Sequence, residues 1–377
     1  FDPFVVIVDS LGIFGSIAKY DTANNCNDPF VFRVDSACPI GHRFTLNLEI
    51  TADSYVMSDS FPVEVGRPFS VGFPVFLGGY VCSSPTVEDL DGDGRNEVVV
   101  GSTNDTLYAI RHNGEIMWRY ATSGDVNSSA AVADLDGDRK LEVVIGASTG
   151  LSQGNIYALT NTGLLKWVFP TVGRVDASPA LGDLDGDGLL NVVVGTANIG
   201  PESGLVYALK QDGDTLWTYQ SQEMIPYSPA LGDLNLDGHT DVVFSASRWL
   251  HGGHVTALNG IDGSVLWKNA TDGYSCSCPS LGDLDNEGNL EIVAGGEDVW
   301  GNGMLFVWNH DGTPFGYDWP ISLPDPVESS PALMDPEEDD TLEIIVRTNW
   351  ELCAINYEGM VLWSRVIPHD GAVRQSS

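Results

Sequence analysis

Residues 89–97 read Asp-Leu-Asp-Gly-Asp-Gly-Arg-Asn-Glu, and the same pattern returns five more times along the chain. The copies begin at Asp134, Asp183, Asp233, Asp283 and Asp335. A repeat of about 50 residues is typical of a propeller blade or a solenoid unit. Each copy also places acidic side chains at alternate positions, as short loops that wrap a hard cation do. The stretch therefore predicts both an architecture and a chemistry.

The residues around the first copy predict four strands in one unit. Ser83 to Val87 leads into the acidic stretch, and the β-branched run 97–101 leaves it. Residues 107–110 and 116–118 predict two more strands, joined through the tight-turn dipeptide Asn113-Gly114. The later units keep this order, and nothing in the sequence resembles an amphipathic helix. Four strands per unit indicate an all-β fold dominated by a β-propeller.

The ends of the repeat region bear on the number of blades. We assign residues 73–377 to the propeller, with six complete repeats. Phe73 matches an outer strand without inner strands before it, and Ser376-Ser377 aligns with Ser83-Ser84 at the start of an inner strand. The simplest account is a seven-bladed ring whose last blade joins the two ends. A six-bladed ring is the alternative if the native chain stops at Ser377.

A large aromatic ring stands at the same distance before each acidic stretch. We expect these rings to fill the wedge between neighbouring blades, where the most area must be covered. The residues are Phe73, Trp118, Trp167, Trp217, Trp267 and Trp319.

Residues 1–66 differ from the repeats. Short runs rich in β-forming residues alternate with turn-prone Asp, Asn, Gly and Pro, which predicts a small N-terminal β-sandwich. Only about four strands are present, whereas a full sandwich of the immunoglobulin type has about seven, so we expect a partial Ig-like domain. Residues 67–72 form the linker. Cys26 and Cys38 lie close enough in this region to form a disulfide.

The charge excludes several classes of partner. The chain carries 17 basic and 53 acidic residues, a net charge of −36. We therefore expect no binding to nucleic acid, which relies on Lys and Arg at phosphates, or to anionic membrane surfaces. No run approaches the roughly 20 apolar residues of a transmembrane helix. The chain begins in mid-pattern at Phe1, as a mature or truncated piece of a longer protein does.

The acidic stretches predict metal sites with defined ligands. In such a loop the side chains at positions 1, 3, 5 and 9 and the carbonyl at position 7 converge, and a Gly near position 6 permits the turn. The first set is Asp89, Asp91, Asp93, the Arg95 carbonyl and Glu97. The others are Asp134, Asp136, Asp138, Lys140 and Glu142; Asp183, Asp185, Asp187, Leu189 and Asn191; Asp233, Asn235, Asp237, His239 and Asp241; Asp283, Asp285, Glu287, Asn289 and Glu291; and Asp335, Glu337, Asp339, Thr341 and Glu343. Arg139 replaces the Gly in the second loop, and the sixth has none.

Ligands that are all oxygen favour Ca²⁺ over Zn²⁺, which prefers nitrogen and sulfur, and over Mg²⁺, which keeps more water. We predict about five to six calcium sites. Like charges so close together repel one another unless a cation lies among them, which indicates that the loops hold ions. We predict a structural rather than a catalytic role, because sites filled at about 1 mM calcium together contribute a free energy comparable with the net stability of a domain.

The loops and their flanks, such as Ser228-Pro229-Ala230-Leu231-Gly232-Asp233, resemble the FG-GAP/VCBS repeat family. That family includes the calcium-binding blades of integrin α-subunits and many secreted microbial proteins. The resemblance implies an extracellular propeller for adhesion, with a protein or glycan as its ligand. Residues 28–32 and 38–42 look like sandwich modules attached to secreted bacterial peptidases.

Other functions are weighed against this one. An extracellular assembly with strands exchanged between copies is the first alternative, and a calcium-loop propeller of the rhamnogalacturonan lyase type is the second. The match of Gly146-Ala147-Ser148-Thr149-Gly150 to a nucleophile elbow lacks the following helix that an elbow needs. His251 and His254 lack a third metal ligand. We therefore expect no enzyme activity from this chain itself, which is also compatible with its being a module of a larger secreted enzyme.

Overall fold

The computed structural model describes residues 5–9, 31–34, 43–52, 55–64, 72–198, 204–248, 252–271, 273–275, 277–316, 318–327, 329–336 and 339–367. Every regular element in these ranges is a strand, so no described helix is long and apolar enough to cross a membrane. The chain divides into two units, Phe1–Pro74 and Val75–Ser377.

The first unit contains two antiparallel strand pairs. Strand β1 (Val5–Asp9) pairs with β2 (Val31–Val34), and β3 (Arg43–Ala52) pairs with β4 (Tyr55–Glu64) along their whole length. Four strands were expected here, and β1, β2 and β3 lie close to the expected runs 5–8, 30–34 and 44–50, whereas β4 begins six residues before the expected run 61–65. An Ig-like arrangement of the two pairs stays a prediction. The possible disulfide between Cys26 and Cys38 lies outside the described residues.

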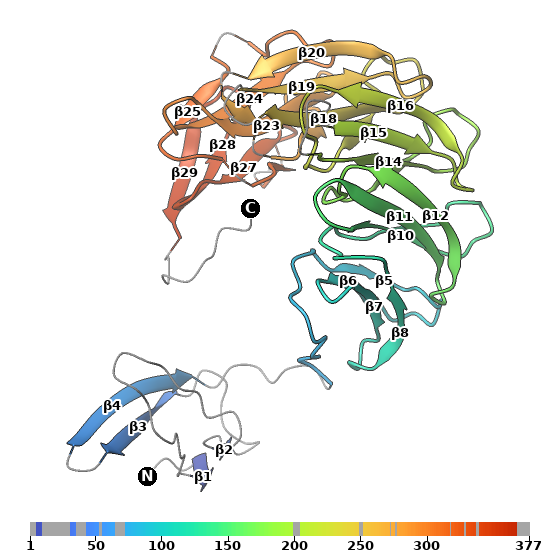
Figure 1. Ribbon diagram of the computed structural model, residues 1–377. Coiled ribbons are helices and arrows are strands. Elements are labelled where there is room, and N and C mark those ends of the chain that lie inside the picture. The colour runs from blue at the N-terminus through green and yellow to red at the C-terminus, as the bar shows by residue number, and fades with distance from the viewer. Residues whose placement is uncertain are drawn as a thin grey trace. The chain divides into compact units, whose positions relative to one another are not determined.

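The described part of the second unit forms six antiparallel sheets in chain order (Figure 1). The first holds β5 (Thr86–Glu88), β6 (Glu97–Ser102), β7 (Thr106–Ile110) and β8 (Ile116–Ala121). The others are β9 (Ala131–Ala133), β10 (Glu142–Ser148), β11 (Gln153–Thr160) and β12 (Leu165–Val172); β13 (Ala180–Gly182), β14 (Asn191–Gly195), β15 (Gly204–Leu209) and β16 (Thr215–Ser221); β17 (Ala230–Gly232), β18 (Asp241–Arg248), β19 (Gly252–Leu258) and β20 (Val265–Thr271); β21 (Tyr274–Ser275), β22 (Ser280–Gly282), β23 (Glu291–Glu297), β24 (Gly303–Trp308) and β25 (Ile321–Leu323); and β26 (Ala332–Met334), β27 (Glu343–Arg347), β28 (Glu351–Ile355) and β29 (Val361–Val366). In the fifth sheet both β21 and β22 pair with β23.

The second to fifth sheets contribute side chains from both faces to core clusters, since successive side chains of a strand point to opposite sides. In β10 every residue is buried. Val143 and Ile145 join a core cluster with the first sheet, whereas Val144 joins one with the third. Five such clusters connect consecutive sheets, and none within the described residues connects the sixth sheet to the first. The all-β propeller fold is confirmed, and its number of blades remains a prediction.

The recurring tryptophans bridge neighbouring sheets, as predicted. The Trp118 indole N–H donates to the Asn161 carbonyl of the second sheet's hairpin at 2.9 Å, and the ring packs against Gly163. The same contact is made by Trp167 with Gln211, Trp217 with Gly260, Trp267 with His310 and Trp319 with Tyr357.

The strand expected at Phe73 is absent, since residues 72–85 contain no strand. Pro74 has no N–H to give to a ladder, and Gly78 adopts a positive φ of 80°. Both features favour an irregular backbone.

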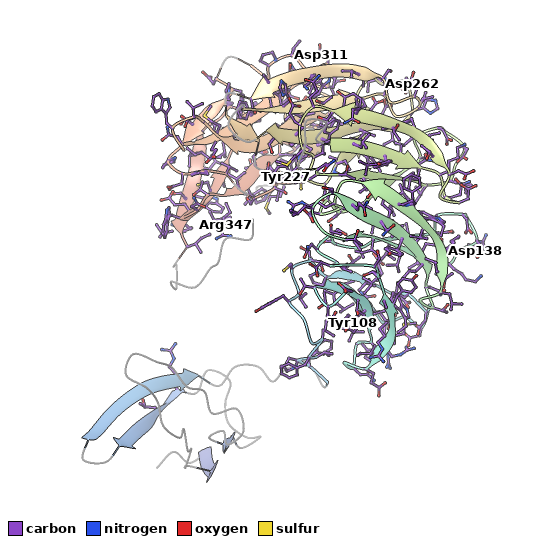
Figure 2. The ribbon with its side chains drawn as sticks, viewed as in Figure 1. Tyr108, Asp138, Tyr227, Asp262, Asp311 and Arg347 are labelled. Carbon is purple, nitrogen blue, oxygen red and sulfur yellow. The ribbon has the colours of Figure 1, made fainter. Side chains whose placement is uncertain are left out.

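The alternation of strand direction assigns the loops to two faces. The acidic stretches join the first and second strands of each sheet, and the hairpins between third and fourth strands lie on that same face. Loops between second and third strands lie on the opposite face. In Figure 2, Asp262 of the β19–β20 hairpin and Asp311 of the β24–β25 connection lie on the outer side of the unit. Tyr227 lies on its inner side.

Candidate metal centres

The first aspartate of each acidic loop fixes the shape of the loop. Asp89 accepts backbone N–H groups from Gly92 and Asp93 on one oxygen, at 2.9 and 3.1 Å, and from Gly94 on the other at 2.8 Å. Equivalent bonds to two or more of these positions form in the other loops, at Asp134, Asp183, Asp233, Asp283 and Asp335. The described parts of the six copies thus share one pattern of backbone hydrogen bonds to the first aspartate.

The sixth position of every loop has a positive φ, as the glycine pattern predicted. Gly94 has a φ of 84° and Gly288 of 91°, and the two residues that replace Gly, Arg139 and Asp340, both have 69°. A side chain in this left-handed region costs roughly 1 kcal/mol or more.

Replacing Arg139 with Gly is therefore expected to stabilise the chain by roughly 0.5–1 kcal/mol, once the greater entropy of an unfolded Gly is subtracted. Chemical denaturation of Arg139→Gly measures the gain. Lys140→Gly is the control because Lys140 lies outside the left-handed region, so this substitution is expected to destabilise. A loss of stability in Arg139→Gly would contradict the argument.

The second and ninth positions tie each loop to the core. Leu90 is buried, and its N–H donates to Glu97 Oε2 at 3.1 Å. The same bond links Leu135 to Glu142, Leu184 to Asn191, Leu234 to Asp241 and Leu284 to Glu291. In the sixth loop Pro336 stands in this place and has no N–H to donate. Sequence reasoning missed the role of this leucine, although its recurrence before the third position was a visible signal.

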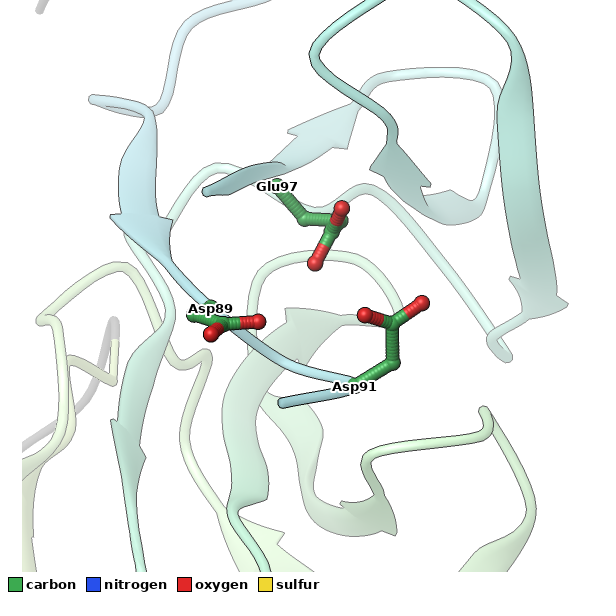
Figure 3. Close-up of side chains that lie close together, drawn as sticks. All are labelled: Asp89, Asp91 and Glu97. Atoms are coloured by element: carbon green, nitrogen blue, oxygen red, sulfur yellow. The ribbon is translucent and has the colours of Figure 1, made fainter. Parts of the chain in front are cut away.

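Carboxylates converge in four of the loops. One oxygen from each of Asp89, Asp91 and Glu97 lies within 4.8 Å of the others, and Figure 3 shows these three groups turned toward one another. The other groups are Asp134, Asp136 and Glu142; Asp183, Asp185 and Asp187; and Asp283, Asp285 and Glu291. The fourth loop forms no such group of acids, since Asn235 occupies its third position. Glu337 of the sixth loop lies outside the described residues.

The fifth-position side chains also hold the backbone of the loop, and their role as metal ligands stays a prediction. Asp93 and Asp138 stand outside the converging groups, and each accepts the N–H of the residue two places on. Asp237 and Asp339 accept the same bond. Asp187 alone belongs to a group. Ligation by the seventh-position carbonyls of Arg95, Lys140, Leu189, His239, Asn289 and Thr341 stays a prediction.

The loops fit a cation because they hold buried carboxylate oxygens with no hydrogen-bond partner. Glu97 is 0% exposed and its Oε1 is unpartnered, as is Asp185 Oδ1. A buried ionised carboxylate is costly unless it is paired. Burial raises the pKa of Glu97, and nearby Asp91 and Asp93 add to the effect against the hydrogen bond from Leu90. Calcium, which takes several carboxylate and carbonyl oxygens at 2.3–2.6 Å, suits this donor set.

Glu291 gives the metal-free fold a pH dependence. Burial, reinforced by the charges of the neighbouring acids, raises the pKa of Glu291 from 4.5 to about 7. A raised pKa in the folded state means that the stability contributed by protonated Glu291 is complete below about pH 4.5 and is lost as the pH rises through about 7. In chelator, we expect the melting temperature to fall between about pH 5 and pH 8. Glu291→Gln should make this slope shallower, and an equal slope in the variant would contradict the assignment.

Basic side chains enter three of the loops, and sequence reasoning did not foresee them. Arg111 Nη1 lies 2.8 Å from Asp91, and Lys210 Nζ lies 3.5 Å from Asp185. Lys166 Nζ lies 2.6 Å from Asp136 and 3.1 Å from Glu142. These basic residues lie far from the loops in sequence. The one signal that could have indicated them is a basic residue at a repeat position where other units have an apolar or an uncharged polar residue.

A family model described as an FG-GAP-like repeat matches residues 89–145 and again residues 134–194. Residues 89–194 thus match two FG-GAP-like repeats. The third and fourth sheets keep the loop, the bulge and the tryptophan contact of these two repeats. The fifth sheet keeps the loop and the tryptophan contact, and the sixth keeps the loop and the bulge. No curated protein matches the sequence.

Solved structures share the propeller of these FG-GAP repeats. A Bacillus licheniformis rhamnogalacturonan lyase has a TM-score of 0.53 at 17% identity, over 91% of this chain and 69% of that one. The rhamnogalacturonan lyase YesW gives 0.52 at 18% identity, over 91% and 69%. BBS1N, solved in complex with ARL6DN, gives 0.50 at 16% identity, over 80% and 86%. At such identities the likeness shows the fold alone.

The sequence around Ser148 and the histidine His254, which were weighed as enzyme-like motifs, both make contacts that hold the fold together. Ser148 ends β10, and its hydroxyl exchanges hydrogen bonds with the backbone of Val175, which lies between β12 and β13. The next element is β11, so there is no nucleophile elbow. His254 lies 2.9 Å from Glu223, which Lys268 also contacts at 3.1 Å. His251 lies outside the described residues.

Proposed function

We propose that this chain is an extracellular, calcium-stabilised propeller that binds a protein or a glycan and carries out no chemistry of its own.

The observation that carries the calcium part is the buried, unpartnered Oε1 of Glu97 beside Asp89 and Asp91. Extracellular calcium modules bind the ion with Kd values of about 10⁻⁴ to 10⁻³ M. Such sites fill at the millimolar calcium found outside cells, which supports that location.

The binding part rests on an exposed aromatic loop on the face opposite the acidic loops. Between β23 and β24, Trp300 is 84% exposed and its neighbour Val299 is also exposed. Asp298 holds the loop by accepting the N–H groups of Trp300 and Asn302 at 2.8 and 2.9 Å. Its other oxygen accepts the side-chain amide of Asn302 at 2.8 Å. A loop backbone held in this way loses little entropy on binding, and the exposed indole that it carries suits a sugar ring or an apolar protein surface.

A glycan array probed with the fluorescently labelled chain in calcium tests this proposal. We expect one class of glycan to bind, and Trp300→Ala to weaken that binding at least about tenfold, as loss of an aromatic anchor does. Leu236→Ala is the control, because Leu236 is exposed on the opposite, acidic-loop face. Equal binding by the Trp300 variant would remove this loop from the proposal. If no glycan binds, the protein ligand becomes the version to test.

Catalysis is tested separately because the fold is shared with lyases. Incubation with rhamnogalacturonan, followed by ultraviolet detection of unsaturated product, should give none. Product formation that depends on calcium would replace the binding role with a lyase.

Self-association is the second candidate, and one observation favours it. All six residues of β29 are exposed, whereas the matching strand β16 buries Trp217 and Ser221. An apolar outer strand that no other described element covers suits a second copy of the chain. Sedimentation of the native chain tests this, and a strict monomer would remove the candidate.

A further inference from the structure

Lys166 occupies the centre of the second acidic loop. It lies on β12, and its Nζ is 2.6 Å from Asp136 Oδ2 and 3.1 Å from Glu142 Oε1. These are the third- and ninth-position carboxylates of the group that also contains Asp134. The Lys166 side chain is 23% exposed and that of Glu142 only 3%. A protein ammonium thus contacts the oxygens that a metal would need.

A β-bulge directs Lys166 into the loop. In the ladder between β11 and β12, Ala158 pairs with Trp167 and Leu159 with Leu165, so Lys166 is the extra residue. A bulge re-aims the side chain it carries. The same bulge occurs in four other sheets, where the extra residue is apolar: Met117, Leu216, Leu266 and Leu362. Lys166 therefore places a cation at a bulge position that is apolar in the four other sheets.

The basic residues of the first and third loops do not fill their sites in this way. Arg111 contacts Asp91 and leaves Glu97 Oε1 without a partner. Lys210 lies 3.5 Å from Asp185 and leaves its Oδ1 unpartnered. No acid of the second loop has a buried, unpartnered oxygen in the described structure.

Lys166 is charged at neutral pH. Carboxylates at 2.6 and 3.1 Å from its Nζ favour the charged form of the amine. A fixed ammonium among these oxygens repels a divalent cation and neutralises part of the repulsion between the acids.

We propose that Lys166 is the resident cation of the second loop, so that this loop holds its shape without calcium while the loops that lack such a lysine depend on the ion. This inference rests on the proposed calcium binding of the other loops. The acidic loop of the second sheet is then the loop whose shape does not depend on calcium.

Native mass spectrometry of the chain in excess calcium counts the bound ions and tests the proposal. Lys166→Met installs the apolar residue found at the bulge of the first sheet, and it should raise the count by one ion. Adding Asp134→Asn to that variant should remove the extra ion, whereas Asp134→Asn in the wild type should not change the count. Lys268→Met removes a charge from the equivalent strand of the fourth sheet, away from any acidic loop, and should also leave the count unchanged.

Two outcomes overturn the proposal: a folded Lys166→Met variant with the wild-type count, or a lower count for Asp134→Asn in the wild type. If Lys166→Met does not fold, the Asp134→Asn result decides alone. Glu97→Gln separates this inference from the proposed function, because that variant should lose one ion. A wild-type chain that binds no calcium, with Glu97→Gln unchanged, defeats the calcium proposal itself.

Discussion

Chelation of calcium is expected to lower the melting temperature of this chain by roughly 4–12 °C. Each site with a Kd of about 10⁻⁴ to 10⁻³ M contributes roughly 0.4–1.4 kcal/mol at about 1 mM calcium. The second loop holds its own lysine, and Pro336 denies the sixth the bond that fixes its ninth residue, so we count the other four loops. Their sum is roughly 2–6 kcal/mol, and a chain of this size melts about 2 °C higher per kcal/mol.

Scanning calorimetry with calcium and then with a chelator measures this difference. Magnesium is the informative control, because it demands a smaller octahedral shell and keeps several waters. It should restore little of the lost stability. An unchanged melting temperature in chelator would contradict structural calcium in the loops.

Trp217→Ala is expected to destabilise the second unit by about 3–5 kcal/mol, the usual loss for a buried tryptophan. Trp217 is 8% exposed, and its ring packs against Gly263 of the next sheet. Its indole N–H donates to the Gly260 carbonyl at 2.6 Å. The substitution opens a cavity between the third and fourth sheets and leaves that carbonyl unpaired. Urea unfolding followed by circular dichroism measures the loss.

Trp363→Ala is the matched control from the same chain. Trp363 pairs with Ala354 as Trp217 pairs with Ala208, so the two occupy one place in the repeat. Trp363 is 39% exposed, and no hydrogen bond of its indole to another sheet is seen in the described structure. Its removal should cost about 1 kcal/mol or less, as surface changes do. Equal losses would mean that the tryptophan contact between sheets is not what stabilises the unit.

Features that arise from short-range periodicity could be predicted from the sequence. Strands 97–101 and 107–110 were expected within one residue of β6 and β7, because β-branched runs and the turn at Asn113-Gly114 act locally. The left-handed sixth position was expected from Gly94 and its repeats. The rings at Trp118 and its equivalents were expected between sheets, since only a fixed structural contact keeps one spacing along a whole chain.

The remaining features depend on contacts that no local pattern carries. Lys166 reaches Asp136 across 30 residues, through a bulge that the sequence does not mark. The backbone N–H groups that Asp93 and Asp138 accept were also not foreseen from the repeat. At Phe73 the aromatic spacing continued, but Pro74 and Gly78 prevented a strand. In each case a three-dimensional contact or a backbone constraint overrode the repeat pattern.

Anomalous X-ray diffraction from crystals grown in calcium tests the central claim most directly, because it locates each ion. The account predicts a calcium peak beside Glu97 of the first loop, with further peaks in the third, fourth and fifth loops and none beside Lys166. Loops without any anomalous peak, with Glu97 bonded only to water or protein, would contradict it.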